Sequence, residues 1–486
     1  MAKRQIFNAK ENRRLWRQSI ILILLIFITG CSKKDEKVSI PFKIYACLDT
    51  IIQDWEGQDV FIKAYNSLTG NDLSIIQPPH QQYMEKLLVS INGGSIPDVF
   101  ESLPEYLSSF IEKDIAFDMT ELVEESKNIA NINPEYLDAI RNIDGKLFAF
   151  PVRRDDGCVT YIRKDWLDNL GLEIPRTWEQ MVEVLRAFTF NDPDGNGTDD
   201  TFGYTDVNGG AEDWYNRVVM LDARVEIYNK DGVWIDGFQE PRFKLALLRF
   251  KQIVDEGLVD PDFLTNTTFA ARTRFFNGEI GVFTYWGNHW ARNFQERTQN
   301  SVGGSVIVKP IPPLESGFYI ERVPPLLVVN SKTEDPQRIF KEFIENQYDK
   351  GQVQTLFTYG VENYHWKYVN GSVEFMSNPK DPYEAKFMKA FVPPSSVIND
   401  WEVPSKADAL IQPARDLIDK FARKEKIMFG GEYFNEYYLE IERSLKPEII
   451  SKILTNEIGV DEGIDLYIIQ SKQLYLDDIL NELNEH

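Results

Sequence analysis

Short apolar segments alternate with longer amphipathic segments along most of this 486-residue chain. Residues 42–47 and 161–163 have the composition of strands, whereas residues 83–91 and 241–254 carry apolar side chains at helical spacing. Alternation of this kind favours an α/β architecture, in which helices cover the faces of sheets. With 43% hydrophobic residues the chain can bury large cores, and its length predicts two or more domains.

Local signals refine this pattern at two places. A helix is predicted to begin after Thr177, because its hydroxyl is a good N-cap and Gln180 stands three residues later, as in a capping box. Asp144-Gly145 predicts a hairpin turn before residues 147–151.

The first thirty residues have the three zones of an export signal: a basic start, an apolar run at 20–28 and small residues before Cys31. As a helix, the apolar run spans only about 14 Å, roughly half of a hydrocarbon core. Ile28-Thr29-Gly30-Cys31 resembles a lipobox, so residues 1–30 are predicted to be a lipoprotein signal peptide and Cys31 the lipid-bearing mature N-terminus. Residues 31–39 are predicted to be a polar tether. The alternative is a secretory signal with an incidental cysteine.

The charge of the mature chain narrows the range of partners. Removing residues 1–30 takes away six of 53 basic and one of 76 acidic residues, so the formal net charge changes from −23 to −28. A surface of this charge argues against nucleic-acid binding. Beyond Cys31 only Cys47 and Cys158 remain, either as a disulfide or, as we favour, as two buried thiols. The four histidines are scattered, which gives little support to a His-based site.

Residues 192–201 carry the sharpest chemical motif. Oxygen-bearing side chains stand at alternate positions and glycine at the sixth, as in the front half of an EF-hand loop. Gly203 stands at position 12 instead of the usual Glu, so no bidentate carboxylate closes the shell from there. An Asp/Gly-rich turn without metal is the alternative. We predict a structural Ca²⁺ held by Asp192, Asp194, Asn196, the Thr198 carbonyl and Asp200.

An ordered series of phrases resembles the extracellular solute-binding proteins of carbohydrate ABC importers, especially their large Gram-positive lipoprotein branch. Each phrase alone is weak evidence, but their order and spacing over residues 40–445 are specific for the family. They indicate almost nothing about which ligand is bound. The phrases are Ser95–Phe100, Asp144–Pro151, Tyr161–Leu167, Leu170–Trp178, Asp255–Pro261, Phe276–Trp286 and Tyr359–Glu362, with Asn370-Gly371 nearby.

The resemblance implies a two-lobed α/β periplasmic-binding-protein (Venus-flytrap) fold of type II, with the ligand cleft between the lobes. Lobe 1 would comprise residues 40–150 and 327–390, and lobe 2 residues 152–325 and 395–486. The chain would cross between them near 151–153, 323–327 and 385–400.

The resemblance also implies a lipid-anchored extracellular receptor, expected to be a monomer and not an enzyme, that binds a carbohydrate and delivers it to permease subunits. Three alternatives stay open: a sensory receptor of the same fold that signals to a membrane kinase, an extracellular glycoside hydrolase with paired carboxylates, and a receptor for a peptide.

Sugar rings need flat aromatic platforms and in-plane hydrogen-bonding groups. Trp286 matches the position of a stacking tryptophan in maltose-binding-type relatives, and Trp214 and Tyr215 lie where relatives place a cleft aromatic; for each, a core or rim position is the alternative. Arginines that face the cleft would favour an acidic sugar, whereas hinge salt bridges would not. The expected ligand-binding residues are Arg153, Arg154, Asp156, Trp214, Tyr215, Trp286, Trp290 and Trp401.

Overall fold

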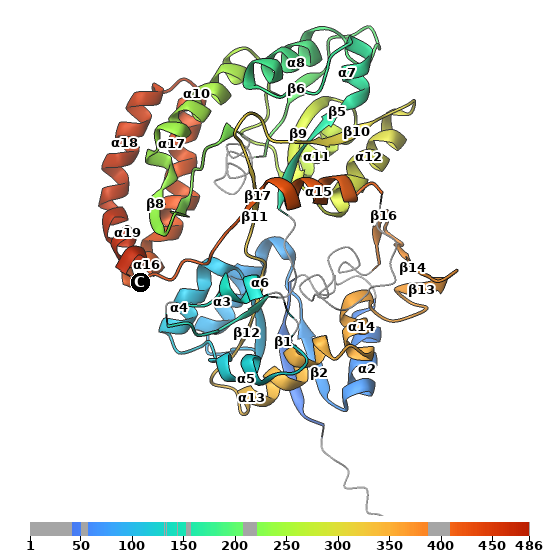
Figure 1. Cartoon of the computed structure of the whole chain (residues 1–486), viewed down its shortest axis with the longest axis vertical. Helices are drawn as coiled ribbons and strands as arrows, with labels where there is room; N and C mark the ends of the chain where they lie inside the picture. Colours follow the sequence, from blue (N-terminus) through green and yellow to red (C-terminus); the bar gives the residue numbers. More distant parts are fainter. Residues whose placement is uncertain are drawn as a thin grey trace, which may run out of the picture. The chain divides into compact units, whose positions relative to one another are not determined.

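The structure of the chain is a computed structural model that describes residues 41–49, 57–130, 132, 134–142, 144–151, 157–207, 221–386 and 409–485. The chain divides into two compact units, Met1–Phe42 and Lys43–His486, and every described helix and strand belongs to the second unit (Figure 1). Among the described residues, no helix is both long and apolar enough to span a membrane.

The first sheet has five strands in the order β2-β1-β3-β12-β4. β1 (Lys43–Cys47) runs parallel to β2 (Asp72–Ile76) and to β3 (Val99–Ser102). β12 (Leu326–Val329) comes from much later in the sequence and pairs antiparallel with both β3 and β4 (Phe150–Pro151). The carboxyl ends of β1, β2 and β3 therefore lie at one edge of this sheet.

Helices that are distant in the sequence pack together beside the first sheet (Figure 1). Phe61 of α2 (Gln58–Thr69) meets Phe357 of α14 (Gln352–Tyr359) edge to face, with ring centroids 5.2 Å apart. Both rings are fully buried, so this contact stabilises the packing of α2 against α14, which lies much later in the sequence. The other helices of this region are α3 (Tyr83–Asn92), α4 (Leu107–Glu112), α5 (Thr120–Glu125), α6 (Pro134–Asp138) and α13 (Pro336–Ile339).

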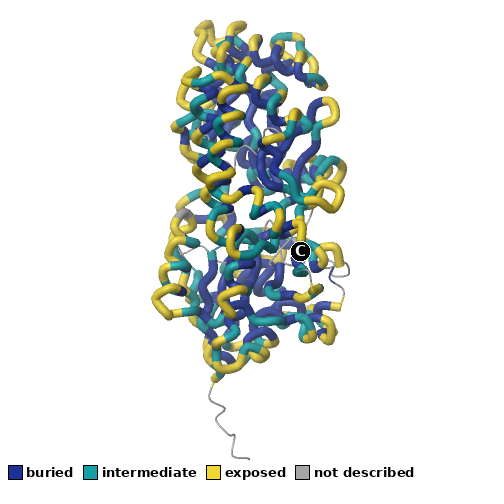
Figure 2. The backbone as a smooth tube through the Cα atoms, turned by 90° about the vertical axis from the view of Figure 1, so that its left-hand side faces the viewer, coloured by how far each residue is buried: buried dark blue, intermediate teal, exposed yellow. Residues whose placement is uncertain are grey.

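The second sheet has four strands in the order β10-β5-β9-β6. β5 (Cys158–Arg163) runs antiparallel to β9 (Ile280–Trp286) and β10 (Val308–Ile311), whereas β6 (Phe202–Tyr204) runs parallel to β9. Every residue of β5 is buried, as expected for a strand covered on both faces. In Figure 2 the buried parts of the tube run through the interior and the exposed residues lie on the outside.

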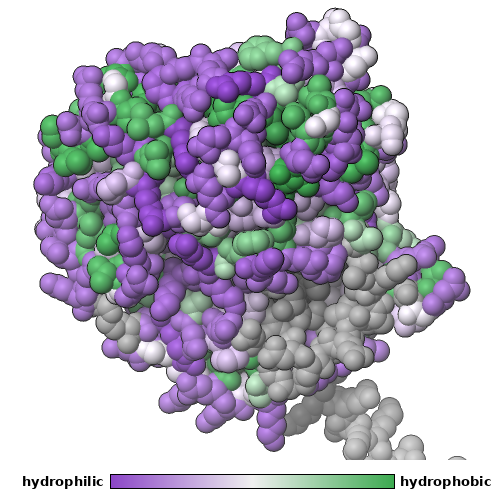
Figure 3. Space-filling model, turned by 45° about the horizontal axis from the view of Figure 1, so that its top comes forward, coloured by the Kyte–Doolittle hydropathy of each residue, from purple (hydrophilic) through white to green (hydrophobic). Residues whose placement is uncertain are grey.

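Two stretches of sequence supply the helices around the second sheet. α8 (Trp178–Phe190) buries Met181, Leu185 and Phe188 in a core that it shares with the C-terminal helices. On the face of the molecule that Figure 3 shows, most residues are hydrophilic and the hydrophobic residues form separate small groups. The other helices are α7 (Lys164–Leu170), α10 (Pro241–Asp255), α11 (Thr268–Phe276), α12 (His289–Val302), α15 (Gln412–Phe421), α16 (Glu432–Glu440), α17 (Lys446–Leu454), α18 (Val460–Gln473) and α19 (Leu476–Glu485).

Two separate passages of the chain run side by side in a two-stranded parallel pair. β11 (Tyr319–Glu321) precedes β12 of the first sheet, and β17 (Ala422–Lys424) precedes the C-terminal helices. The remaining strands form the pairs β7 (Ile227–Lys230) with β8 (Val233–Asp236), β13 (Trp366–Val369) with β14 (Ser372–Phe375), and β15 (Ser377–Asn378) with β16 (Asp381–Ala385). Short 3-10 or π turns are η1 (His80–Gln82), η2 (Pro104–Tyr106), η4 (Gly237–Gln239), η5 (Phe340–Ile344), η6 (Glu345–Tyr348) and η9 (Ile441–Leu445).

The predicted elements at 42–47, 83–91, 161–163 and 241–254 are confirmed as β1, α3, part of β5 and α10. Thr177 caps α8, and its hydroxyl accepts from the Gln180 amide at 3.3 Å. The reciprocal bond differs from a capping box, because the Gln180 side chain accepts from the amide of Arg176 at 2.8 Å.

The hairpin predicted at Asp144-Gly145 is wrong. The turn itself forms, with the amide of Gly145 donating to the carbonyl of Asn142 at 2.9 Å. The strand that follows is β4, and it pairs with β12 instead of with the residues before the turn. Cys47 on β1 and Cys158 on β5 belong to different sheets and are buried free thiols, as we favoured from the sequence.

A fully buried lysine holds the C-terminal helices to the rest of the second core. Lys446 at the start of α17 donates to the carboxylates of Glu442 at 2.6 Å and Asp236 at 2.9 Å, and to the carbonyl of Val225 at 2.8 Å. Burial opposes the charge of Lys446, but the two carboxylates outweigh it and raise the pKa of the lysine. Burial also raises the pKa of Glu442, to about 7, although Lys446 pulls it down.

Replacing Lys446 by methionine is expected to lower the free energy of unfolding by about 3 to 5 kcal/mol, because Glu442 and Asp236 are left buried without the cation. Chemical denaturation measures this loss. Lys452→Met on the same helix is the matched control, since Lys452 pairs with Glu448 on the solvent side and should unfold close to wild type. Equal losses in the two variants would contradict the assigned role of Lys446.

Candidate ligand-binding site

One edge of the second sheet collects strand ends from three parts of the chain. β6 and β9 are parallel, so their carboxyl ends share this edge, and the antiparallel β5 begins there. Cys158 at the start of β5 stands opposite Trp286 at the end of β9. The amide of Gly287 donates to the carbonyl of Gly157 at 3.0 Å and closes the pair. In α/β sheets, ligands bind outside the carboxyl ends of strands, so this edge is the first part of the candidate site.

Trp286 is partly exposed at this edge. A hydrogen bond fixes the backbone of Trp286, because the hydroxyl of Tyr161 donates to the Trp286 carbonyl at 2.7 Å. The guanidinium of Arg322, from the segment between β11 and β12, lies 5.2 Å from the centre of the Trp286 ring. Trp286 is named from the sequence as an expected ligand contact, which stays a prediction, whereas Arg322 is not named, because it is distant in the sequence and belongs to no quoted motif.

Trp290 lies in the first turn of α12, where Asn288 caps the helix. Its ring meets Tyr285 edge to face with centroids 5.3 Å apart, and the guanidinium of Arg272 lies 4.0 Å from its centre. Arg272 also donates to the hydroxyl of Tyr285 at 3.3 Å. The structure therefore places Trp286 and Trp290 at the same end of β9, with Trp290 held in an aromatic and guanidinium cluster.

The other predicted residues lie outside the described part of the chain. Residues 208–220 continue from Val207 after β6, and residues 152–156 precede Gly157 before β5. Those outside the described residues are Arg153, Arg154, Asp156, Trp214, Tyr215, Trp401 and the lipidation residue Cys31.

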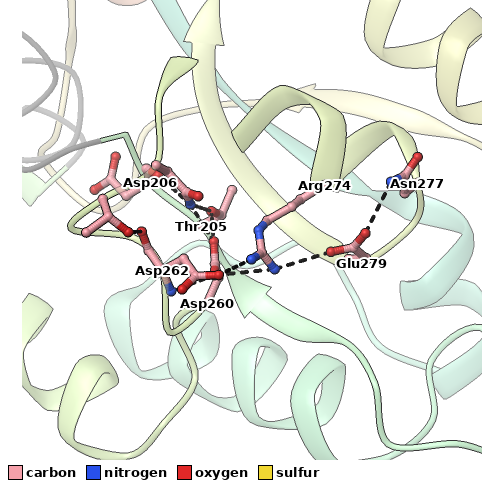
Figure 4. A network of polar contacts seen from close by, with 9 residues as sticks. Thr205, Asp206, Asp260, Asp262, Arg274, Asn277 and Glu279 are labelled. Carbon is pink, nitrogen blue, oxygen red and sulfur yellow. Dashed lines mark hydrogen bonds and ion pairs between the residues drawn. The ribbon is translucent and has the colours of Figure 1, made fainter. Parts of the chain in front are cut away.

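A buried polar network fixes the chain just beyond β6 (Figure 4). Asp260 is fully buried and accepts from the hydroxyl of Thr205 at 2.6 Å and from the side-chain amide of Asn266 at 2.6 Å. Asn266 also donates to the carbonyl of Asp206 at 3.2 Å. The guanidinium of Arg274 lies 3.6 Å from Asp260. Asp262, Glu279 and Asn277 extend the network toward solvent.

The edge of the first sheet carries a second polar group, which sequence reasoning missed. Asp49 follows β1 and pairs with the ring of His80 at 2.8 Å, and its amide donates to the carboxylate of Glu101 on β3 at 3.0 Å. Gln77, after β2, donates to the carbonyl of Asp49 at 2.8 Å. Asp49 and Gln77 each follow a strand of the parallel pair β1 and β2. This position was the signal that could have found them, because the carboxyl ends of parallel strands meet at one edge.

The loop at 192–201 brings its predicted ligands together. The carboxylate of Asp192 accepts from the amide of Asn196 at 3.0 Å, and the Asn196 side chain donates to Asp194 at 3.0 Å and Asp200 at 3.3 Å. The hydroxyl of Thr198 reaches Asp200 at 3.3 Å. Burial, together with the neighbouring carboxylates of Asp192 and Asp200, raises the pKa of Asp194.

This oxygen-only donor set fits Ca²⁺, which prefers carboxylate and carbonyl oxygens. Burial is the main cause of the raised pKa of Asp194, and a cation would relieve the added repulsion from Asp192 and Asp200. Within the described part of the chain, however, no group of three or more His, Cys, Asp or Glu side chains is already close enough to hold a metal ion.

A cavity of about 200 Å³ lies away from both sheet edges, between α3, α4 and α16. Leu88, Phe110 and Phe434 supply apolar walls, and Glu105 and Lys113 supply charged ones. None of the predicted ligand-binding residues lines it. We therefore assign the candidate site to the sheet edges, where the aromatic and charged side chains gather.

Comparison with known proteins agrees with this geometry. The chain is 24% identical over 451 residues to the lipoprotein LipO of Bacillus subtilis (strain 168), covering 87% of this chain and 88% of LipO. The crystal structure of the alginate-binding protein AlgQ2 without calcium ion superposes with a TM-score of 0.71 at 18% identity, covering 92% of this chain and 98% of that one.

A second solved structure is the EF-hand mutant of the ABC-transporter substrate-binding protein FusA of S. pneumoniae in complex with fructo-nystose. It has a TM-score of 0.67 at 17% identity, covering 91% of this chain and 98% of that one. These likenesses confirm the predicted two-lobed α/β fold. The sequence profile of bacterial extracellular solute-binding proteins matches residues 57–354. The chain therefore belongs to the bacterial extracellular solute-binding protein family.

Proposed function

We propose that the chain is a lipid-anchored extracellular receptor that binds a carbohydrate and delivers it to the permease subunits of an ABC importer. The observation that carries the proposal is Trp286, which stands partly exposed at the carboxyl edge of the second sheet with Arg322 beside it. An indole face suits the C–H face of a sugar ring, and the polar groups around Asp49 and Glu101 on the first sheet suit its hydroxyls.

A ligand that touches both sheet edges would stabilise the closed arrangement of the lobes, since only there does it contact both sides. The limits of 40–150 with 327–390 for lobe 1, and of 152–325 with 395–486 for lobe 2, are part of this proposal. The names of AlgQ2 and FusA, an alginate-binding protein and a substrate-binding protein in complex with fructo-nystose, support a saccharide ligand. Arg153, Arg154, Asp156, Trp214, Tyr215, Trp290 and Trp401 remain proposed ligand contacts.

A structural Ca²⁺ in the loop at 192–201 is the second part of the proposal. Asp192, Asp194, Asn196 and Asp200 would supply side-chain oxygens and Thr198 its carbonyl. The mutual contacts of these residues support the site, as do the calcium and EF-hand in the names of the AlgQ2 and FusA structures. The ion would hold the loop after α8 and take no part in ligand chemistry.

Trp286→Ala is expected to weaken binding of the best saccharide in a mixed panel by about 30-fold or more, because a central aromatic contact is lost. Isothermal titration calorimetry measures the affinity. Tyr368→Ala, an aromatic 54% exposed on β13, is the control and should bind as wild type. Unchanged affinity of Trp286→Ala, or hydrolysis of the saccharide, would contradict the proposed receptor.

Removing calcium with EDTA is expected to lower the melting temperature, because an ion at 100 times its Kd contributes about 2.7 kcal/mol to the folded state. Scanning calorimetry measures the shift. Asp194→Asn should melt lower in calcium and respond less to EDTA. Asp231→Asn, in the exposed turn between β7 and β8, should respond as wild type does. An identical melting temperature with and without EDTA rules the site out.

Cys31→Ser is expected to abolish lipid attachment and move the protein from the membrane pellet to the soluble fraction, because the thiol that receives the lipid is gone. Fractionation and intact mass measure both effects. Ser32→Ala is the matched control and should stay in the pellet. A Cys31→Ser protein that still carries lipid would overturn the anchor.

A further inference from the structure

Two arginines lie beside aromatic rings near the carboxyl end of β9. The guanidinium of Arg322 lies 5.2 Å from the ring centre of Trp286, and that of Arg272 lies 4.0 Å from that of Trp290 and 5.5 Å from that of Tyr285. All of these except Tyr285 are partly exposed. In a chain with a formal net charge of −23, Arg322 places a positive charge beside the ring proposed to meet the sugar.

The two arginines are placed for different tasks. Arg272 contacts the rings of both Tyr285 and Trp290 and donates to the hydroxyl of Tyr285 at 3.3 Å, so it supports the aromatic cluster. Arg322 comes from the segment between β11, which pairs with β17, and β12 of the first sheet. It therefore reaches the ring of Trp286 from a passage of chain that leads to the other sheet, where a ligand shared by the two lobes would lie.

A guanidinium that lies over an aromatic face keeps its N–H donors in its own plane. Those donors form a fork that fits a carboxylate with two parallel hydrogen bonds, and partial burial strengthens the pair. A uronic-acid residue presents a C–H face for the indole and a carboxylate at its rim. A neutral sugar of the same size presents the face without the charge.

We propose that the ligand is an acidic oligosaccharide and that Arg322 binds a uronate carboxylate beside the ring of Trp286. This inference rests on the proposed carbohydrate function and adds the charge class of the ligand. Arg322 is then the residue that determines specificity, Trp286 the platform and Arg272 a positioning residue for the aromatic cluster.

The test is calorimetry on the full-length lipidated chain in detergent, with oligogalacturonate and oligomannuronate as acidic probes. Each is compared with its methyl ester of the same length, which keeps the ring and removes the charge. We expect one of the acids to bind about 10- to 100-fold more tightly than its ester, and the preference to shrink as salt is raised.

Arg322→Gln should reduce the preference for the acid over the ester to about twofold or less, and Arg322→Lys should keep part of it, since an ammonium retains the charge but not the fork. Arg186→Gln is the matched control, because Arg186 on α8 pairs with Glu256, the residue that follows α10, and lies at neither sheet edge. A thermal melt of each variant separates lost recognition from lost folding, and a failed Arg322→Gln fold leaves Arg322→Lys to decide.

Equal binding of acid and ester, or an acid preference that survives in Arg322→Gln, overturns the inference while the carbohydrate receptor stands. Binding confined to neutral oligosaccharides also overturns the proposed acidic ligand and leaves the carbohydrate receptor in place. Failure of every saccharide in the panel, acidic and neutral, instead overturns the proposed function and the inference with it.

Discussion

The parallel pairing of β6 with β9, and of β1 with β2 and β3, is the constraint on which the candidate site depends. Parallel strands end at a common edge, so residues from distant parts of the chain meet there without any local signal. Register matters as much as direction. A slip of one residue in β9 would turn Trp286 to the opposite face of the sheet and remove it from Arg322.

Buried polar groups hold these edges in place. The bond from Tyr161 to the carbonyl of Trp286, and the Thr205–Asp260–Asn266 cluster, fix the ends of β9 and β6 before any ligand arrives. A surface organised in this way loses little conformational freedom on binding, which favours affinity. The salt bridges of Lys446 serve a different purpose, since they join the C-terminal helices to the second core through Glu442 and through Asp236 at the end of β8.

Sequence reasoning succeeded where the determinants are local. The N-cap Thr177 and the helical spacing of residues 241–254 involve neighbours a few positions apart. The oxygen-rich loop at 192–201 is also a contiguous motif, but its calcium site stays a prediction. It failed where long-range pairing decides. The strand after Asp144-Gly145 pairs with β12 and not across its own turn.

The residues of the candidate site also fall into two groups: those named from the sequence and those that only the topology brings together. Trp286 could be named because it belongs to an ordered family phrase, whereas Arg322 beside it comes from a different passage of the chain. The pair formed by Asp49 and His80 was missed because scattered histidines give no spacing signal, and only the sheet brings the ends of β1 and β2 together. Side chains that act across strands are visible in sequence only once the topology is known.

The central claim is that a saccharide closes two lobes around itself, and pulsed electron paramagnetic resonance tests it most directly. Spin labels at Leu68→Cys on α2 and Phe190→Cys on α8 occupy exposed positions, while the native thiols of Cys47 and Cys158 are buried. With the saccharide that binds in calorimetry, we expect the distance between the labels to shift to a shorter, narrower distribution. An identical distribution with and without saturating saccharide would contradict binding between the lobes.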